Sequence, residues 1–79
     1  MNWAQSLERA EVVFAEMPEQ DQSALPRNLI AYGFQKSVPA LFFHNVAREY
    51  RAKGNHGSVQ LAEAADRLAE KLANSVIQN

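Results

Sequence analysis

The two histidines are the side chains best suited to chemistry near neutral pH, because only imidazole titrates there without help from its surroundings. His44 lies in an apolar stretch. A helical metal site would need a second ligand three or four residues after it, where the sequence has Ala47 and Arg48. His56 precedes a glycine in a short polar stretch. We therefore expect His44 to play a structural part, His56 to be solvated, and neither to bind a metal.

The remaining candidate groups do not form a catalytic constellation. Cysteine is absent, and no Gly-x-Ser-x-Gly turn presents a nucleophile. Residues 54–57 lack the Lys and Ser/Thr of a phosphate-binding loop. Neighbouring carboxylates such as Glu8 and Glu11 fall on helix faces that should be exposed, where they make poor general acids or bases. We therefore predict a protein that is not an enzyme and that has no cofactor and no metal.

Apolar periodicity predicts an all-α chain, because spacings of three and four residues recur and no segment alternates with a period of two. Four helices are expected, over residues 2–17, 23–34, 37–53 and 58–77. The short links between them favour a small four-helix bundle. At 79 residues, the chain is expected to form one domain over residues 1–79.

Helix boundaries are predicted from Asn, Ser, Pro and Gly. Four residues are expected to cap helix starts: Asn2, Ser23, Ser37 and Ser58. Pro18 should end the first helix and begin a polar connection that runs to Gln22. Gly33 should end the second helix in a left-handed conformation, and the third helix should stop at Gly54.

The segment 37–53 is expected to be the helix around which the others pack. Its first half is apolar and its second half is basic, so we expect two or three other helices to cover its start. The last helix should bury a stripe made of Leu61, Ala65, Leu68, Leu72 and Val76, and its many alanines should allow close helix approach. Glu63 and Arg67 are expected to pair on its outer face.

The net charge of −1 hides a segregation of charge along the chain. Residues 1–25 carry five acids and one base, whereas residues 26–53 carry five bases and one acid. Two explanations are open. Either the acidic first helix lies beside the basic central helix within the fold, or the basic residues form a face for an acidic partner.

The leading functional hypothesis is a small non-catalytic protein that acts by binding another protein. The contact surface is expected on the acidic first helix or at the basic end of the central helix, around Arg48, Tyr50, Arg51 and Lys53, because Tyr and Arg are common interface anchors. We expect the partner to be another protein, an acidic one included, or a second copy in a homodimer.

The alternative hypothesis is a DNA-binding regulator with a helix-turn-helix over residues 23–53. The second helix of such a motif reads bases near its N-terminus, where this chain is mainly apolar. The net charge also speaks against binding a phosphate backbone.

Three short stretches carry a resemblance to a known family. They are Asn28-Leu-Ile-Ala-Tyr-Gly33, Val38-Pro39 and Val46-Ala-Arg-Glu49. In this order they resemble the middle of the theta-type subunits of bacterial replicative polymerases. The resemblance implies a three-helix accessory protein that binds a proofreading subunit. It is confined to residues 28–49, needs a gap and ends at Glu49, and we assign no family from it.

The first residues have neither the basic start nor the apolar run of a secretory signal, and no apolar run is long enough to span a membrane. We therefore expect a soluble cytoplasmic protein with no membrane partner.

Overall fold

The computed structural model describes the backbone of residues 2–77 and the side chains of residues 2–74. Within that range the chain forms five helices and no strand: α1 (Trp3–Glu16), α2 (Glu19–Ala24), α3 (Arg27–Phe34), α4 (Pro39–Lys53) and α5 (His56–Ile77). The predicted all-α bundle is confirmed, although it contains one short helix more than expected.

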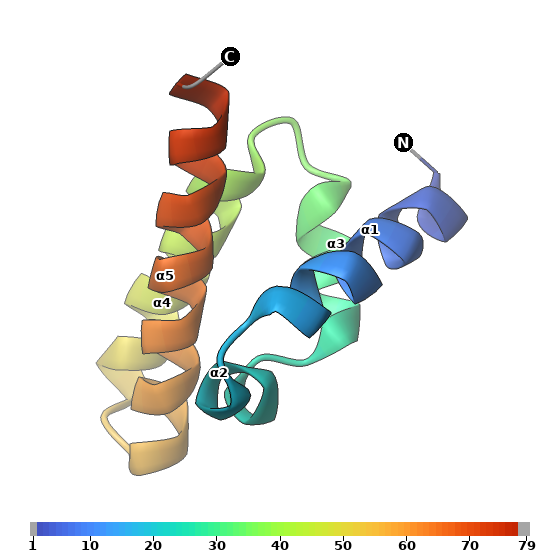
Figure 1. Ribbon diagram of the computed structural model, residues 1–79. Coiled ribbons are helices and arrows are strands. Elements are labelled where there is room, and N and C mark those ends of the chain that lie inside the picture. Colours follow the sequence, from blue (N-terminus) through green and yellow to red (C-terminus); the bar gives the residue numbers. More distant parts are fainter. Residues whose placement is uncertain (1, 78–79) are drawn as a thin grey trace.

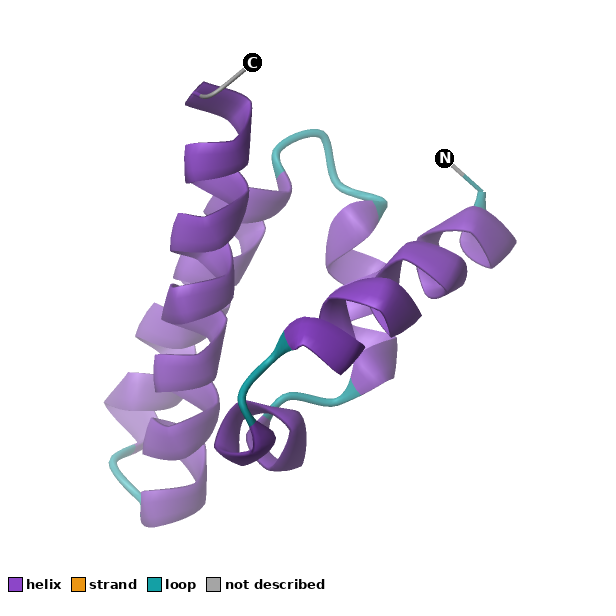
Figure 2. Cartoon of the chain, viewed as in Figure 1, coloured by secondary structure: helices purple, strands orange, loops and turns teal. Residues whose placement is uncertain are grey.

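The helices are arranged as two pairs joined by a short bridge (Figure 1). α4 and α5 lie side by side along most of their length, and α1 packs on α3. The short α2 lies at the foot of the molecule against α5. Figure 2 shows the loops that flank α2 and the longer loop that carries the chain from α3 to α4.

The core lies between the two pairs and has an aromatic centre. Phe43 of α4 is fully buried, with its ring 6.3 Å from that of Phe34 and 5.1 Å from that of Phe42, both edge to face. Such geometry matches the ring quadrupoles. Small residues surround this centre, because five alanines on α4 and α5 are fully buried: Ala47, Ala62, Ala64, Ala65 and Ala69. The expected close approach of the last helix is confirmed. The side chain of Val76, placed on its stripe, lies outside the described residues.

The segment around α2 differs from the prediction. Residues 18–22 were expected to be a connection and residues 23–34 one helix, but the chain forms α2 first and starts α3 only at Arg27. Pro18 and Pro26 each precede a helix, because their fixed φ suits a helix start. The ring of Pro26 also holds Leu25 in extended backbone, which separates the two helices. Ser23 is therefore not a cap; its hydroxyl donates to the Glu19 carbonyl within α2.

Two predicted helix ends are confirmed by local hydrogen bonding or backbone geometry. Asn2 caps α1 through a reciprocal box: Asn2 Oδ1 accepts from the Gln5 amide at 2.9 Å, and Gln5 Oε1 accepts from the Asn2 amide at 3.1 Å. Gly54 ends α4 with φ of 79°, a left-handed conformation that glycine adopts without a Cβ penalty.

Three other boundaries were predicted wrongly. Ser37 does not cap α4, which starts at Pro39 with Val38 before it and no side-chain cap. Ser58 lies inside α5, and its amide donates instead to Asn55 Oδ1 at 2.8 Å. Gly33 does not adopt a left-handed conformation, because it is a buried helical residue of α3 against which the ring of Phe43 packs.

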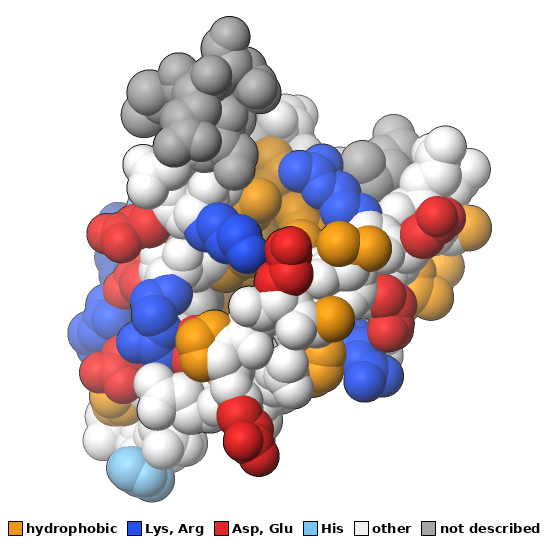
Figure 3. All heavy atoms as spheres, in the orientation of Figure 1, with side chains coloured by type: hydrophobic (Ala, Val, Ile, Leu, Met, Phe, Trp, Pro, Cys, Tyr) orange, Lys and Arg blue, Asp and Glu red, His pale blue; other side chains and the backbone are white. Residues whose placement is uncertain are grey.

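The charge pairing also differs from the expectation. α1 packs chiefly on α3 rather than on the basic central helix, and Glu11 pairs with Arg27 of α3 at 3.7 Å. Glu16 pairs with Lys71 of α5 at 3.3 Å. Arg67 pairs with Asp21 of α2 instead of the predicted Glu63. Figure 3 shows acidic and basic side chains interleaved over α1, α2 and α5. The acids of residues 1–25 that form ion pairs are thus paired with cations of α3 and α5.

The central helix chiefly contacts two other helices, the lower end of the two or three that were expected. α4 packs extensively on α5 and touches α3 much less. With the helices grouped in pairs, the side of α4 opposite the core faces solvent. Phe43 is buried, but Val38 and Leu41 are more than half exposed.

Candidate protein-binding surface

The four residues predicted to bind a partner are spread around α4. Arg51 faces α5, where its Nη2 lies 2.7 Å from Asp66 Oδ2. Tyr50 is half-buried and packs against the core, and Lys53 lies over its ring with Nζ 5.2 Å from the centroid. Arg48 faces solvent and donates to Asn45 Oδ1. The structure therefore brings Tyr50 and Lys53 together and separates them from Arg48.

Asp66 of α5 is the acceptor that organises the seam between α4 and α5. It accepts from Arg51 and forms a 3.2 Å hydrogen bond with His44 Nδ1. Burial acts to raise the pKa of Asp66, but the hydrogen bonds and charges of Arg51 and His44 outweigh it, so the pKa lies below its ordinary value. His44 thus contacts a carboxylate between helices, as the structural role predicted for it requires.

An exposed apolar surface lies at the junction between α3 and α4. We call it the corner patch, and it consists of Tyr32, Val38, Leu41 and Phe42. Tyr32 is 48% exposed, Val38 55% and Leu41 57%, which is unusual for three large apolar side chains close together. The rings of Tyr32 and Phe42 meet edge to face with centroids 5.5 Å apart. Two helices therefore contribute to one apolar surface.

Local geometry explains why these side chains point outward. Val38 precedes a proline, which keeps its backbone extended and outside the helix. Leu41 lies two residues before the buried Phe43, so the two side chains point about 200° apart around the helix. Burying Phe43 in the core therefore turns Leu41 toward solvent.

Polar and basic groups surround the corner patch. Lys36 Nζ lies 4.3 Å from the Tyr32 ring centroid and 5.9 Å from that of Phe42, and it donates to the Tyr32 hydroxyl at 3.0 Å. An open groove of about 270 Å³ runs over the patch and is lined by Lys36, Ser37, Val38, Leu41, Phe42 and Asn45. An apolar centre with a polar rim is the usual anatomy of a protein interface.

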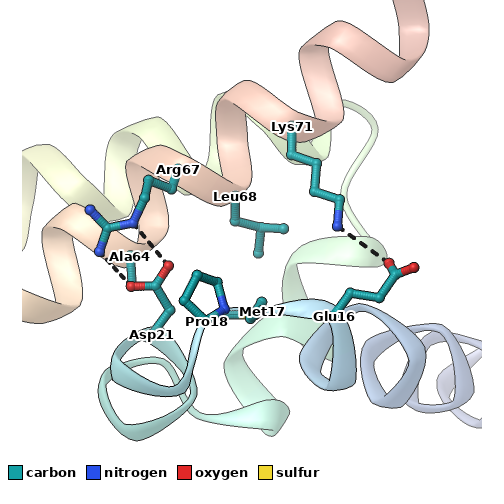
Figure 4. A pocket seen from close by; sticks show the side chains of 8 residues that line it. All are labelled: Glu16, Met17, Pro18, Asp21, Ala64, Arg67, Leu68 and Lys71. Atoms are coloured by element: carbon teal, nitrogen blue, oxygen red, sulfur yellow. Dashed lines mark hydrogen bonds and ion pairs between the residues drawn. The ribbon is translucent and has the colours of Figure 1, made fainter.

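A second hollow lies between the end of α1, α2 and α5, and Figure 4 shows the side chains that line it. Arg67 and Asp21 face each other on one side, with Arg67 Nε 2.9 Å from Asp21 Oδ2. Lys71 and Glu16 face each other on the other side, with Leu68 between the two pairs. The hollow measures about 90 Å³, well below the roughly 300 Å³ of a small-molecule site.

The residues around this hollow are best understood as a clamp. The hydrogen bond to the Asp21 carboxylate raises the pKa of Arg67 and outweighs the opposing desolvation. Beside Asp21, Gln22 Nε2 donates to the carbonyls of Phe14 and Met17 at 3.0 and 3.1 Å. The Phe14 carbonyl, in the last turn of α1, also accepts from the Met17 amide at 3.1 Å, so Gln22 adds a second donor there and binds the carbonyl of Met17, the residue that follows α1. α2 therefore ties α1 to α5.

In the described part of the chain, no group of three or more His, Cys, Asp or Glu side chains is placed to hold a metal ion. No helix there is both long enough and apolar enough to cross a bilayer.

The protein is a small all-α bundle, and no part of the described chain covers its exposed corner patch. No family model, curated protein or solved structure matches the sequence.

The corner patch was only partly visible in the sequence. Leu41 had been grouped with the apolar flank of the central helix, and Tyr32 with the apolar side of the helix before it. One signal was available: Leu41 lies seven residues before Arg48, and residues seven apart share a helix face. Because Arg48 is expected to face solvent, a leucine on the same helix face is expected to be exposed too.

Proposed function

We propose that this protein is a non-catalytic helical adaptor that acts by binding another protein, and that the corner patch is its contact surface. The single observation that supports the proposal is the exposure of Val38 and Leu41 in one groove, next to the edge-to-face contact between Phe42 of that groove and the half-exposed Tyr32. Fully burying a side chain of this size is worth about 1.5–3 kcal/mol. Because these side chains are about half exposed, a partner that covers them would gain roughly half of that free energy for each one.

Under this proposal, the four residues that the sequence predicted for binding have different roles. Arg48 lies on the exposed side of α4 and extends the corner patch along the helix. Arg51 already has a carboxylate partner in Asp66, so its main contribution would be to hold α4 against α5. Tyr50 and Lys53 would contact a partner only if it reached the end of α4.

DNA remains the alternative function, and the exposed residues favour a protein. A recognition helix presents polar side chains to base edges near its N-terminus. Val38 and Leu41 occupy the exposed side of that part of α4. A protein surface accepts such side chains better than a DNA groove does. Salt-dependent binding to duplex DNA that persists in a Leu41→Asp variant would reverse this preference.

The test compares a substitution on the patch with one of equal exposure elsewhere. Leu41→Asp places a charge at the centre of the patch, and Val12→Asp does the same on α1, where Val12 is 60% exposed. Circular dichroism should show both variants folded, because neither side chain is in the core. In cross-linking from the cells that make the protein, we expect wild type and Val12→Asp to capture the same partner and Leu41→Asp to lose it. Equal capture by all three proteins would refute the corner patch as the contact surface.

A further inference from the structure

The cations of this protein fall into two groups. Four are held in ion pairs with carboxylates of another helix: Arg27, Arg51, Arg67 and Lys71. Lys36 and Arg48 have no carboxylate partner among the described residues; Lys36 stacks on Tyr32 and Phe42, and Arg48 donates to Asn45. Arg9 and Lys53 also lack one and stack on aromatic rings away from the patch.

Lys36 and Arg48 lie at opposite ends of the corner patch. Leu41, Asn45 and Arg48 follow one another at spacings of four and three, which places them on one face of α4, and Val38, just before the helix, lines the same groove as Leu41 and Asn45. At 1.5 Å per residue, Arg48 lies about 10 Å along the helix from Leu41. Lys36 contacts the aromatic end of the patch. The exposed strip therefore has an apolar centre with a cation at each end, and its one acid, the exposed Glu49 beside Arg48, leaves it with a net positive charge.

We propose that the occupant of this strip is an amphipathic helix of a partner protein that carries acidic residues on both sides of its apolar anchors. This inference rests on the proposed function and specifies the chemistry of the partner. Two or three apolar side chains at helical spacing would cover Val38, Leu41 and Phe42, and the flanking carboxylates would meet Lys36 and Arg48. Helix-in-groove docking of this kind uses anchors at positions i, i+3 or i+4, and i+7.

Charge also distinguishes this occupant from a second copy of the chain. In an antiparallel two-fold pairing of α4 with itself, Lys36 of one copy would face Arg48 of the other. In a parallel pairing, the two Arg48 side chains would face each other. With Glu49 beside each Arg48 included, both arrangements still leave a net positive charge along the interface edge, which opposes association. Acidic side chains on a different protein remove that conflict.

The experiment selects peptides without assuming a partner. A displayed library of helical 14-residue peptides is selected on the wild-type protein in the presence of excess Leu41→Asp protein, so that only peptides that need the patch survive. We expect the survivors to share apolar residues at helical spacing with Asp or Glu on either side. Lys36→Gln and Arg48→Gln should each weaken a selected peptide about two- to fivefold, as expected for exposed ion pairs.

A matched control and a charge swap make the outcome decisive. Arg9→Gln removes a cation that also lacks a carboxylate partner among the described residues but lies on α1, away from the strip, and it should leave peptide affinity unchanged. Arg48→Glu should lose the acidic peptide and bind a peptide whose flanking acid is changed to Lys. Survivors that are basic or uncharged, survivors that bind Leu41→Asp equally well, or the absence of survivors would each overturn the acidic-helix proposal. If cross-linking still captures a partner that Leu41→Asp loses, the proposed function stands although this inference fails.

Discussion

Replacing Gly33 by alanine should destabilise this protein, although the same change in most helices is favourable. Gly33 lies in α3, where alanine would normally gain about 0.5–1 kcal/mol of helix propensity. A Cβ at this position would lie 2.3 Å from Phe43 Cζ and 2.8 Å from Phe42 Cδ2. Carbon atoms in contact prefer about 3.5–4.0 Å, so the Phe43 ring would have to move by more than 1 Å, about a third of that contact distance.

The Phe43 ring has no free space into which it can move. It is fully buried and contacts the rings of Phe34 and Phe42 on two sides. Overpacking of this kind costs about 1–3 kcal/mol, which exceeds the propensity gain. We therefore expect Gly33→Ala to lose about 0.5–2 kcal/mol of unfolding free energy. For a chain of this size, 1 kcal/mol corresponds to a change in Tm of about 4–8 °C.

Gly57→Ala provides the matched control. Gly57 also lies in a helix, but its nearest foreign atom to an added Cβ is Asn55 Oδ1 at 3.8 Å, an ordinary contact. Its alanine variant should melt at the wild-type temperature or a few degrees above it. Thermal and urea unfolding followed by circular dichroism measure both changes. In a Phe43→Leu background the cost of Gly33→Ala should shrink, because the smaller side chain removes the contact. A Gly33→Ala protein as stable as wild type, or a cost unchanged in that background, would refute the packing argument.

Two further predictions concern the ion pairs. Asp21→Asn removes the negative charge that the buried Asp21 presents to Arg67. It should lower the free energy of unfolding in urea by about 1–3 kcal/mol, the range for a hydrogen bond to a charged group. Glu16→Gln, which alters the exposed pair with Lys71, is the control and should lower it by well under 1 kcal/mol. Asp66 should make the protein less stable in acid, because its pKa is lower in the folded state than in the unfolded state. Its contribution to the free energy of unfolding is present above the ordinary aspartate pKa of about 3.9 and is lost as the pH falls through the lower pKa of the folded state. Unfolding measured from pH 6 to pH 2 should therefore show a shallower acid limb for Asp66→Asn than for wild type, and an identical limb would contradict this assignment.

Features that depend on neighbours along the chain were the ones that could be predicted. The start of α1 at the Asn2 capping box and the end of α4 at Gly54 both follow from the chemistry of a few adjacent residues. Such interactions form wherever the local sequence forms a helix, so they need no knowledge of the tertiary fold.

α2 shows the opposite case. Its six residues carry no apolar stripe, so residues 18–22 were predicted to be a connection and not a helix. Its helical state is supported by Asp21 reaching Arg67 and by Gln22 reaching the end of α1. Arg67 is 46 positions along the chain from Asp21, so no pattern within the helix could reveal the pairing. Gly33 is similar, because its close contact with Phe43 exists only once α3 and α4 have packed.

The corner patch shows a different limit of periodicity. An apolar residue beside a buried one was assigned to the core, but a helix that packs on one main partner has only one buried side. Leu41 and Phe43 are equally apolar in sequence, yet one is 57% exposed and the other is fully buried. Deciding between them requires the number of helices that cover α4, which is a property of the whole fold.

The charge segregation along the chain connects the fold with the proposed partner. Its two explanations were an internal match between acidic and basic helices and a basic face for an acidic partner. Glu11, Glu16 and Asp21, three of the five acids in residues 1–25, are paired with cations of α3 and α5, so none of these pairs involves α4. Lys36 and Arg48, at the two ends of the corner patch, have no carboxylate partner among the described residues. Internal pairing in one part of the fold thus supports, rather than replaces, an acidic partner at the other.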